Sequence, residues 1–369
     1  MAESGAQPGR RTAHPYYMHD AIREQPARIA RLLNTQSTLL ERAADAAASR
    51  RRLILAGIGT SYHAAQVGEH FLRHGTGGRA QVLVEQSFEL VHYPLVLSSD
   101  DAFVVISHRG WKNYSVRALQ VARAAAALTI AVTGQEAGEG MLAADFVVPT
   151  CEQEISFAHT KSYTTALAAL AVLAIRVAER RNQLRDVAAA RAALERIPAR
   201  MQSALDGEPQ AREVARQLAS RHRWVFLGAG PNWATAREGA LKVKETCYIA
   251  AEGLQTEQFL HGPLAEMDAR AALVALLTGG PSDERMCDVL RAAGELGVLR
   301  VAVAAAGASH APAEHVLEVP AAEEWLSPFV LAVPLQLLSY YAALERGADP
   351  DTGREDDPGH ARAKQHYRL

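Results

Sequence analysis

The sequence predicts an α/β protein in which a doubly wound parallel sheet, flanked by helices, occurs twice. Apolar segments of strand length alternate with helical patterns along most of the chain, as in a parallel sheet covered on both faces. Two of these segments, LILAGIG (53–59) and WVFLGAG (224–230), end in glycines and lead directly into a helical pattern. Because similar elements follow each of them in the same order, we interpret the chain as a duplicated domain rather than a short repeat.

The first half begins with an N-terminal region. Residues 1–14 are small and polar and are predicted to be disordered. Residues 16–40 have helical spacing, with a predicted break at Gln25-Pro26 because proline cannot donate a backbone hydrogen bond. The first sheet is predicted from strands at 53–59, 80–85, 102–108, 128–134 and 146–150, with helices at 60–74 and 114–127.

The second half follows a long alanine-rich stretch. Residues 162–218 are helical in pattern throughout, with a break at Pro198. The second sheet is predicted from strands at 224–230, 272–279, 300–307 and 316–320, with helices at 234–248, 286–297 and 327–344. The predicted organisation is a disordered start and N-terminal helix (1–45), a first α/β domain (46–183), a helical linker (184–212), a second α/β domain (213–346) and a tail (347–369).

Composition excludes several classes of protein. At 369 residues the chain is long enough for two domains, and its net charge of -2 predicts no general attraction to nucleic acid or to an anionic membrane. We see no secretory signal and no uninterrupted apolar segment long enough to span a membrane. Three separated cysteines argue against a disulfide framework or a structural zinc site, and favour a reducing cytoplasm.

Two loops at predicted strand ends carry groups that bind anions. GIGTS (57–61) is a glycine turn that feeds a helix, so Gly59, Thr60 and Ser61 can present backbone and hydroxyl donors to an anion. The alternative is that Thr60 or Ser61 only caps the helix. In SHRGWKNYS (107–115), Ser107, Arg109 and Lys112 can reach the same anion, unless this loop is simply solvated.

A third loop and a helix supply further candidates. EISFAHTKSYTT (154–165) opens a helical region, where His159 and Lys161 can line a pocket; by itself this segment favours helix capping. In EGALKVKETCY, Lys242 and Glu245 share a helical face. Glu245 can carry a proton between adjacent sugar carbons if burial tunes its pKa toward neutrality, although the pair can also be a simple salt bridge.

His261 follows in FLHGPLAEMD, in front of a Gly-Pro turn and close enough in sequence to fold back on the Glu245 helix. A histidine there can act as the acid/base that opens the sugar ring, and the alternative is an ordinary core or loop histidine. Ligands of such sheets bind beyond the carboxyl ends of the strands, where these loops fall. No metal or redox cofactor is expected, because the carbonyl of the substrate itself accepts the electrons.

The ordered set of motifs resembles the sugar isomerase (SIS) family, and within it the isomerase half of the glutamine–fructose-6-phosphate aminotransferases. The motifs are YMHDAIREQP, GIGTSYHAA, EISFAHTKSYTT, EGALKVKETCYIAAE and HGPLAEMD, and the resemblance runs from Tyr17 to the C-terminus. It implies two tandem SIS domains and a homodimer whose active site is shared, with the His261 loop commonly contributed by the partner chain. It also implies that Lys364, in ARAKQHYRL, lies on a tail that closes over the sugar.

The resemblance implies roles for individual residues. Glu245 is the proton carrier, His261 opens the ring, Lys242 supports Glu245, and Lys364 can form an imine with an open-chain ketose. The motifs also imply which positions bind the substrate, and at some of them this chain has another residue type than the family. The residues of this chain at these positions are Gly59, Thr60, Ser61, Ser107, His108, Arg109, Lys112, Phe157 and His159.

The chain also departs from the family pattern. No glutaminase domain is expected, because residues 1–16 are too short to hold one. SHRGWKN replaces the family's SQSGET loop, which makes the predicted site more basic and bulkier. His159 stands where the synthase has a serine, and Gln258 replaces a glutamate.

The sequence predicts an enzyme that isomerises an amino-sugar or keto-sugar phosphate. Glucosamine-6-phosphate deamination and fructosamine-phosphate deglycation are the two forms considered. The alternative is a regulatory protein that binds sugar phosphates without catalysis. Against it, no DNA-binding segment is apparent before Tyr17, and Lys242, Glu245 and His261 are all present.

Overall fold

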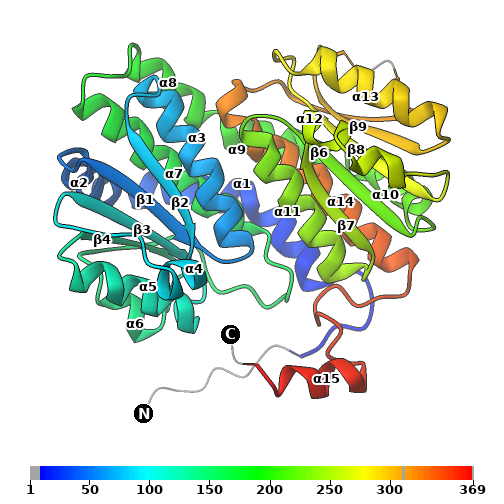
Figure 1. Ribbon diagram of the computed structural model, residues 1–369. Coiled ribbons are helices and arrows are strands. Elements are labelled where there is room, and N and C mark those ends of the chain that lie inside the picture. Colours follow the sequence, from blue (N-terminus) through cyan, green and yellow to red (C-terminus); the bar gives the residue numbers. More distant parts are fainter. Residues whose placement is uncertain (1–8, 310–311, 368–369) are drawn as a thin grey trace.

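A computed structural model describes residues 9–309 and 312–367, and contains two parallel five-stranded sheets side by side (Figure 1). The strand orders are β2-β1-β3-β4-β5 and, read from the other edge, β7-β6-β8-β9-β10, so each strand has a counterpart at the same place in the other sheet. This confirms the predicted duplicated α/β fold. The strands are β1 (Arg52–Gly57), β2 (Gln81–Gln86), β3 (Asp101–Ser107), β4 (Leu128–Thr133), β5 (Phe146–Pro149), β6 (Arg223–Gly228), β7 (Ala250–Gln255), β8 (Ala271–Leu277), β9 (Leu299–Ala305) and β10 (His315–Val319).

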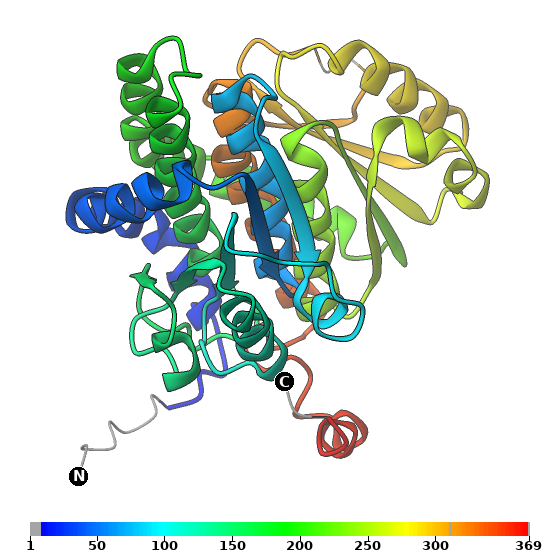
Figure 2. The same ribbon diagram turned by 60° about the vertical axis from the view of Figure 1, so that its left-hand side comes forward.

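Helices cover both faces of each sheet, and the two inner faces share one hydrophobic core (Figures 1 and 2). Leu53 and Leu55 of β1 face this central core, whereas Ile54 and Ala56 face an outer one, as the period of two in a strand requires. The inner helices are α1 (Tyr17–Thr35), α2 (Ser37–Ala48), α3 (Thr60–Thr76), α7 (Lys161–Arg180), α8 (Val187–Glu195), α9 (Ile197–Leu205), α10 (Glu208–Leu218), α11 (Pro231–Thr246) and α14 (Ser327–Glu345). The outer helices are α4 (Ser87–His92), α5 (Asn113–Ala124), α6 (Glu139–Leu142), α12 (Thr256–Leu260) and α13 (Asp283–Glu295).

Two helical segments have the length and composition to cross a membrane. They are α7 and the stretch Glu324–Glu345, and 83% and 100% of their apolar windows are buried inside the fold. Both therefore serve as core helices between the sheets. The predicted continuous helical pattern of 162–218 is in fact four helices, α7 to α10, with Pro198 in the first turn of α9.

The predicted helix break at Gln25-Pro26 is wrong, because α1 continues through Pro26. Proline leaves the carbonyl four residues earlier, that of Ile22, without its usual backbone donor. The side-chain amide of the buried Gln25 donates to this carbonyl at 2.9 Å and replaces the missing bond. Gln25 also accepts from Thr164 of α7 and donates to Gln336 of α14, so the repaired turn joins three helices.

Strand β7 was not predicted, and it changes the position of His261. Its sequence, AAEGLQ, has no β-branched or aromatic residue, and it forms an edge of the sheet beside β6. The chain therefore leaves α11, passes along β7 and enters α12 before it reaches His261. The sequence expectation that His261 folds straight back onto the Glu245 helix overlooked this intervening strand.

Matching glycine turns start α3 and α11. A Cβ on Gly57 would lie 2.5 Å from the backbone of Ser61, and Gly59 has φ +58°. Gly228 and Gly230 repeat this arrangement, with a 2.0 Å approach and φ +53°. The helices that follow, α3 and α11, pack against each other between the sheets. In a sheet of this order, the crevice between β1 and β3 is the switch point where ligands bind.

The segment before α1 and the C-terminal tail, as far as the structure describes them, lie together below the sheets (Figure 1). Residues 1–8 of the predicted disordered start lie outside the described residues. Arg10, in an irregular segment, donates to Asp349 at 3.0 Å. Asp351 accepts the backbone N–H groups of Tyr17 and Met18, which caps α1 from the tail. The tail contains a short exposed helix, α15 (Pro358–Lys364).

Candidate active site

A pocket lies at the carboxyl ends of β1, β3 and β4, beside the N-terminus of α3. Four of the predicted substrate-binding residues line it: Thr60, Ser61, His108 and His159. The rest of its wall consists of Ala64, Ile106, Val132, Thr133, Thr150, Ser162, Tyr163 and Ala166. Predicted loops from separate strands therefore converge on one concave site.

Lys242 joins the second domain to this pocket. Its ammonium group is fully buried and donates to Glu245 at 2.6 Å, to the carbonyl of His159 at 3.0 Å and to the Thr60 hydroxyl at 3.3 Å. A carboxylate oxygen of Glu238 lies 3.3 Å away. Although burial alone would lower the pKa of Lys242, Glu238 and Glu245 raise it, so the amine stays charged.

The two carboxylates around Lys242 differ in their pKa shifts. Burial alone would raise the pKa of Glu238, but Lys242, His63 and Thr60 together lower it. Burial raises the pKa of Glu245; Lys242 offsets part of this rise, and repulsion by Glu238 adds to it. Two nearby acids with opposite shifts are a pattern of acid–base sites, and Glu245 is the one suited to exchange a proton.

Sequence reasoning missed Glu238 and His63. Glu238 accepts from the Thr60 hydroxyl at 3.0 Å and lies 2.7 Å from Nδ1 of His63. Glu238 precedes Lys242 by four residues and Glu245 by seven, so helical spacing alone could have placed all three on one face. The partnership of Glu238 with His63 depends on the packing of α3 against α11, which no local pattern reveals.

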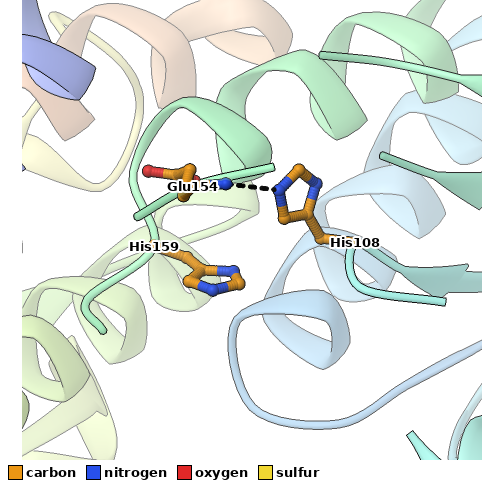
Figure 3. Close-up of side chains that lie close together, drawn as sticks. All are labelled: His108, Glu154 and His159. Atoms are coloured by element: carbon orange, nitrogen blue, oxygen red, sulfur yellow. Dashed lines mark hydrogen bonds between the residues drawn. The ribbon is translucent and has the colours of Figure 1, made fainter. Parts of the chain in front are cut away.

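Two histidines meet at the base of the pocket, although they come from loops far apart in the sequence. Figure 3 shows the rings of His108 and His159 beside Glu154; the ring centroids lie 5.2 Å apart, with an edge-to-face angle of 87°. The backbone N–H of Glu154 donates to Nε2 of His108 at 3.3 Å, so the proton of the neutral ring is on Nδ1. Burial lowers the pKa of His108 to about 4 and also lowers that of His159, so both rings are neutral at pH 7.

We tested whether His108, Glu154 and His159 fit a metal ion. Their ligand atoms lie within 4.8 Å of one another, whereas tetrahedral zinc holds its ligand atoms about 3.4 Å apart. The Glu154 carboxylate already accepts from the backbone of Thr160 and Ser162 and from the Thr160 hydroxyl. The lone pair on Nε2 of His108 faces the Glu154 amide as well. Two of the three side chains are therefore committed to internal hydrogen bonds, and we assign no metal site.

The end of β3 and the loop after it carry the hydroxyl of Ser107 and two basic side chains, none of which is among the residues that line the pocket. The hydroxyl of Ser107 is buried and has no hydrogen-bond partner within the described chain. Arg109 lies over the ring of Trp111, and burial lowers the pKa of Lys112, with Arg109 and Lys364 adding to the shift. No carboxylate among the described residues pairs with Arg109 or Lys112, which leaves their charges available to an anion.

Three predicted residues lie away from the pocket. Phe157 packs against Gly353 at the base of the tail. Lys364 pairs with Glu355 of the tail itself. The side chain of His261 is 70% exposed at the end of α12, where it contacts Glu257 at 3.2 Å. The described chain therefore does not bring His261 or Lys364 to Glu245.

The comparison with known families agrees with this architecture. The SIS domain matches residues 47–176 and again residues 217–346, which correspond to the two sheets and their helices. The chain belongs to the SIS domain family, as its motifs predicted.

Relatives within the family are enzymes of sugar-phosphate metabolism. The chain is 30% identical over 356 residues to a glutamine–fructose-6-phosphate aminotransferase (isomerizing) of Pyrococcus horikoshii, and 32% identical over 366 residues to that of Pseudomonas putida. These matches cover 96% and 95% of the chain but only 58% and 59% of the relatives. The chain thus spans little more than half the length of the curated relatives.

Solved structures share the fold. The C-terminal domain of glucosamine-fructose-6-phosphate aminotransferase from Francisella tularensis superposes with a TM-score of 0.83 at 24% identity, covering 92% of this chain and 99% of that one. Glucosamine-6-phosphate deaminase from Thermotoga maritima gives a TM-score of 0.75 at 19% identity, covering 91% of this chain and 96% of that one. At these identities the likeness concerns the fold alone.

Proposed function

We propose that this protein is an aldose–ketose isomerase of phosphorylated sugars that acts on an amino-sugar or keto-sugar phosphate. The observation that carries the proposal is the arrangement of Glu245, Lys242 and Glu238 beside the pocket of the first domain. Glu238 and Lys242 remain charged, and the raised pKa of Glu245 suits a base that takes a proton from carbon and returns it. The phosphate would be held by Thr60, Ser61 and Ser107, with Arg109 and Lys112 at the rim.

In the deaminating form, Glu245 moves a proton between C1 and C2 of the open-chain amino sugar. This converts the aldehyde and amine into a C2 imine, which water hydrolyses to the ketose phosphate and ammonia. A deglycase would carry out the related cleavage of a sugar–amino acid conjugate, whose carboxylate would suit the basic rim. The relative named glucosamine-6-phosphate deaminase supports the first form by fold only.

We also propose a cytoplasmic homodimer in which His261 serves the partner's pocket. The exposed position of His261, away from Glu245 of its own chain, supports this arrangement. Lys364 would reach the sugar only if the tail moved from its present ion pair with Glu355.

Release of ammonia and of ketose phosphate tests the function. The panel comprises glucosamine-6-phosphate, galactosamine-6-phosphate and fructosamine-6-phosphate conjugates, each with the wild type and Glu245→Gln. We expect Glu245→Gln to lower turnover by about 10²–10⁴-fold. The acid limb of kcat/KM in the wild type should lie above the ordinary glutamate pKa, because burial raises that of Glu245.

Full turnover by Glu245→Gln would refute the proposed mechanism. Thermal stabilisation by the same sugars without any release by the wild type would indicate a sugar-phosphate sensor instead. If the wild type shows no release and no stabilisation with any sugar of the panel, the hexosamine phosphates are excluded as its ligands.

A further inference from the structure

The imidazole ring of His159 faces the pocket in which we propose that the substrate binds, and no described residue forms a hydrogen bond with it. The ring lines the pocket together with Thr60 and Ser61. No hydrogen bond to the ring is present in the described part of the chain, whereas the carbonyl of the same residue holds Lys242 at 3.0 Å. One residue thus links the pocket to the Lys242–Glu245 pair.

The surroundings of His159 fix its ring in place. His108 packs edge-to-face against it, and His108 is itself held by the amide of Glu154. Glu154 is anchored in turn by the first backbone N–H groups around the start of α7. Figure 3 shows the three side chains gathered from these two loops. A donor oriented in this way loses little freedom when a ligand arrives, which is the requirement for electrostatic preorganisation.

We infer that His159 is a catalytic residue whose neutral imidazole donates a hydrogen bond to the sugar oxygen on which charge develops during proton transfer. The inference rests on the proposed isomerase function. When Glu245 removes a proton from the carbon beside the carbonyl, the electron pair moves onto the carbonyl oxygen. The N–H of His159 stabilises this oxygen, the proton returns to the neighbouring carbon, and the imidazole is unchanged at the end.

A neutral ring suits this role better than a charged one. An imidazolium ion would be too strong an acid and would give up its proton to the intermediate, whereas a neutral imidazole polarises the carbonyl and keeps its proton. Neutral histidines with depressed pKa values pair with a glutamate base in this way in isomerases of other folds. The lowered pKa of His159, caused mainly by burial, agrees with the geometry.

The test compares two substitutions at this position. His159→Leu removes the donor, and His159→Gln replaces it with a neutral amide donor. His74→Leu is the matched control, since His74 stacks on Trp325 outside the pocket. Calorimetry would measure the binding of two ligands built on the same sugar: a phosphosugar hydroxamate, which mimics the charged intermediate, and the corresponding open-chain polyol phosphate, which does not.

We expect wild type and His74→Leu to prefer the hydroxamate strongly. His159→Leu should bind it about 100-fold or more weakly while keeping its affinity for the polyol phosphate within threefold. Its kcat should fall by about 10²–10³-fold with little change in KM, and His159→Gln should recover most of both losses.

Equal preference of His159→Leu and wild type for the hydroxamate would overturn the inference, as would a wild type that does not prefer the hydroxamate. A loss in His159→Gln as large as in His159→Leu would also overturn it, because a charged acid–base role would then be required. Since the affinities for the hydroxamate and the polyol phosphate do not depend on turnover, they judge His159 even if Glu245→Gln shows that the proposed reaction is wrong.

Discussion

Replacement of Lys242 by methionine gives the sharpest test of how the two domains are joined. Methionine keeps the length and apolar stem of lysine but removes the charge that lies between Glu238 and Glu245. The Glu238 side chain is only 2% exposed, so its carboxylate would be left in the interior without its cation. Breaking a buried ion pair from one side typically costs about 3–5 kcal/mol, and we expect Lys242→Met to lower the free energy of unfolding by that amount.

The assay is urea unfolding monitored at two wavelengths, with Glu238→Gln/Lys242→Met as the partner variant. The added Gln removes one stranded charge and retains a polar group beside Thr60 and His63, so it should recover about 1.5 kcal/mol or more. Without lysine, the pKa values of both carboxylates are raised in the folded state. The loss in the free energy of unfolding should therefore be greatest near pH 8 and should shrink as falling pH protonates the two carboxylates. A cost under about 1 kcal/mol, or one that grows toward acid pH, would refute this account.

Two pairs of substitutions test the buried hydroxyl of Ser107 and the repaired turn of α1. Ser107→Ala removes a buried hydroxyl that has no protein partner, so the affinity for sugar phosphate measured by calorimetry should fall about 3- to 10-fold, while stability stays within about 0.5 kcal/mol. Thr133→Val should instead cost about 1 kcal/mol of stability, because that hydroxyl donates to the carbonyl of Ser107; a reversed ranking in stability would contradict the assignment. Gln25→Leu should destabilise by about 2–3 kcal/mol in urea unfolding, since it leaves the Ile22 carbonyl without a donor. Adding Pro26→Ala should return about 1 kcal/mol, and no recovery would show that the amide does not replace the missing backbone bond.

The fold could be predicted because buried parallel strands are nearly continuous apolar runs. β3, with every residue buried, was found within one residue of its observed bounds. β7 was not found, because its small and polar residues form an edge strand with no apolar pattern. The sequence likewise predicted a break at Pro26 and could not foresee that Gln25 would repair the turn, since that depends on the side-chain conformation.

The pocket residues that directly follow a strand could be predicted from the sequence. Thr60, Ser61 and His108 could be placed because the carboxyl ends of parallel strands meet at one edge. The contact between His108 and His159 was not predictable, since two loops separated by about fifty residues of chain decide it. The position of His261 required knowledge of β7, and its proposed role requires a second chain.

The buried amine of Lys242 has a consequence for how such a protein can change. Its three hydrogen bonds end on α11 of its own domain and, in the other domain, on the loop carbonyl of His159 and on Thr60, the first residue of α3. Any substitution that shifts one domain against the other therefore also displaces Glu245, the proposed proton carrier, relative to the pocket. Natural substitutions at this contact between the two domains should therefore be selected both for stable folding and for turnover. New substrate preferences should accordingly arise on the outer rim near Trp111, where a side chain can change without disturbing the join between the domains.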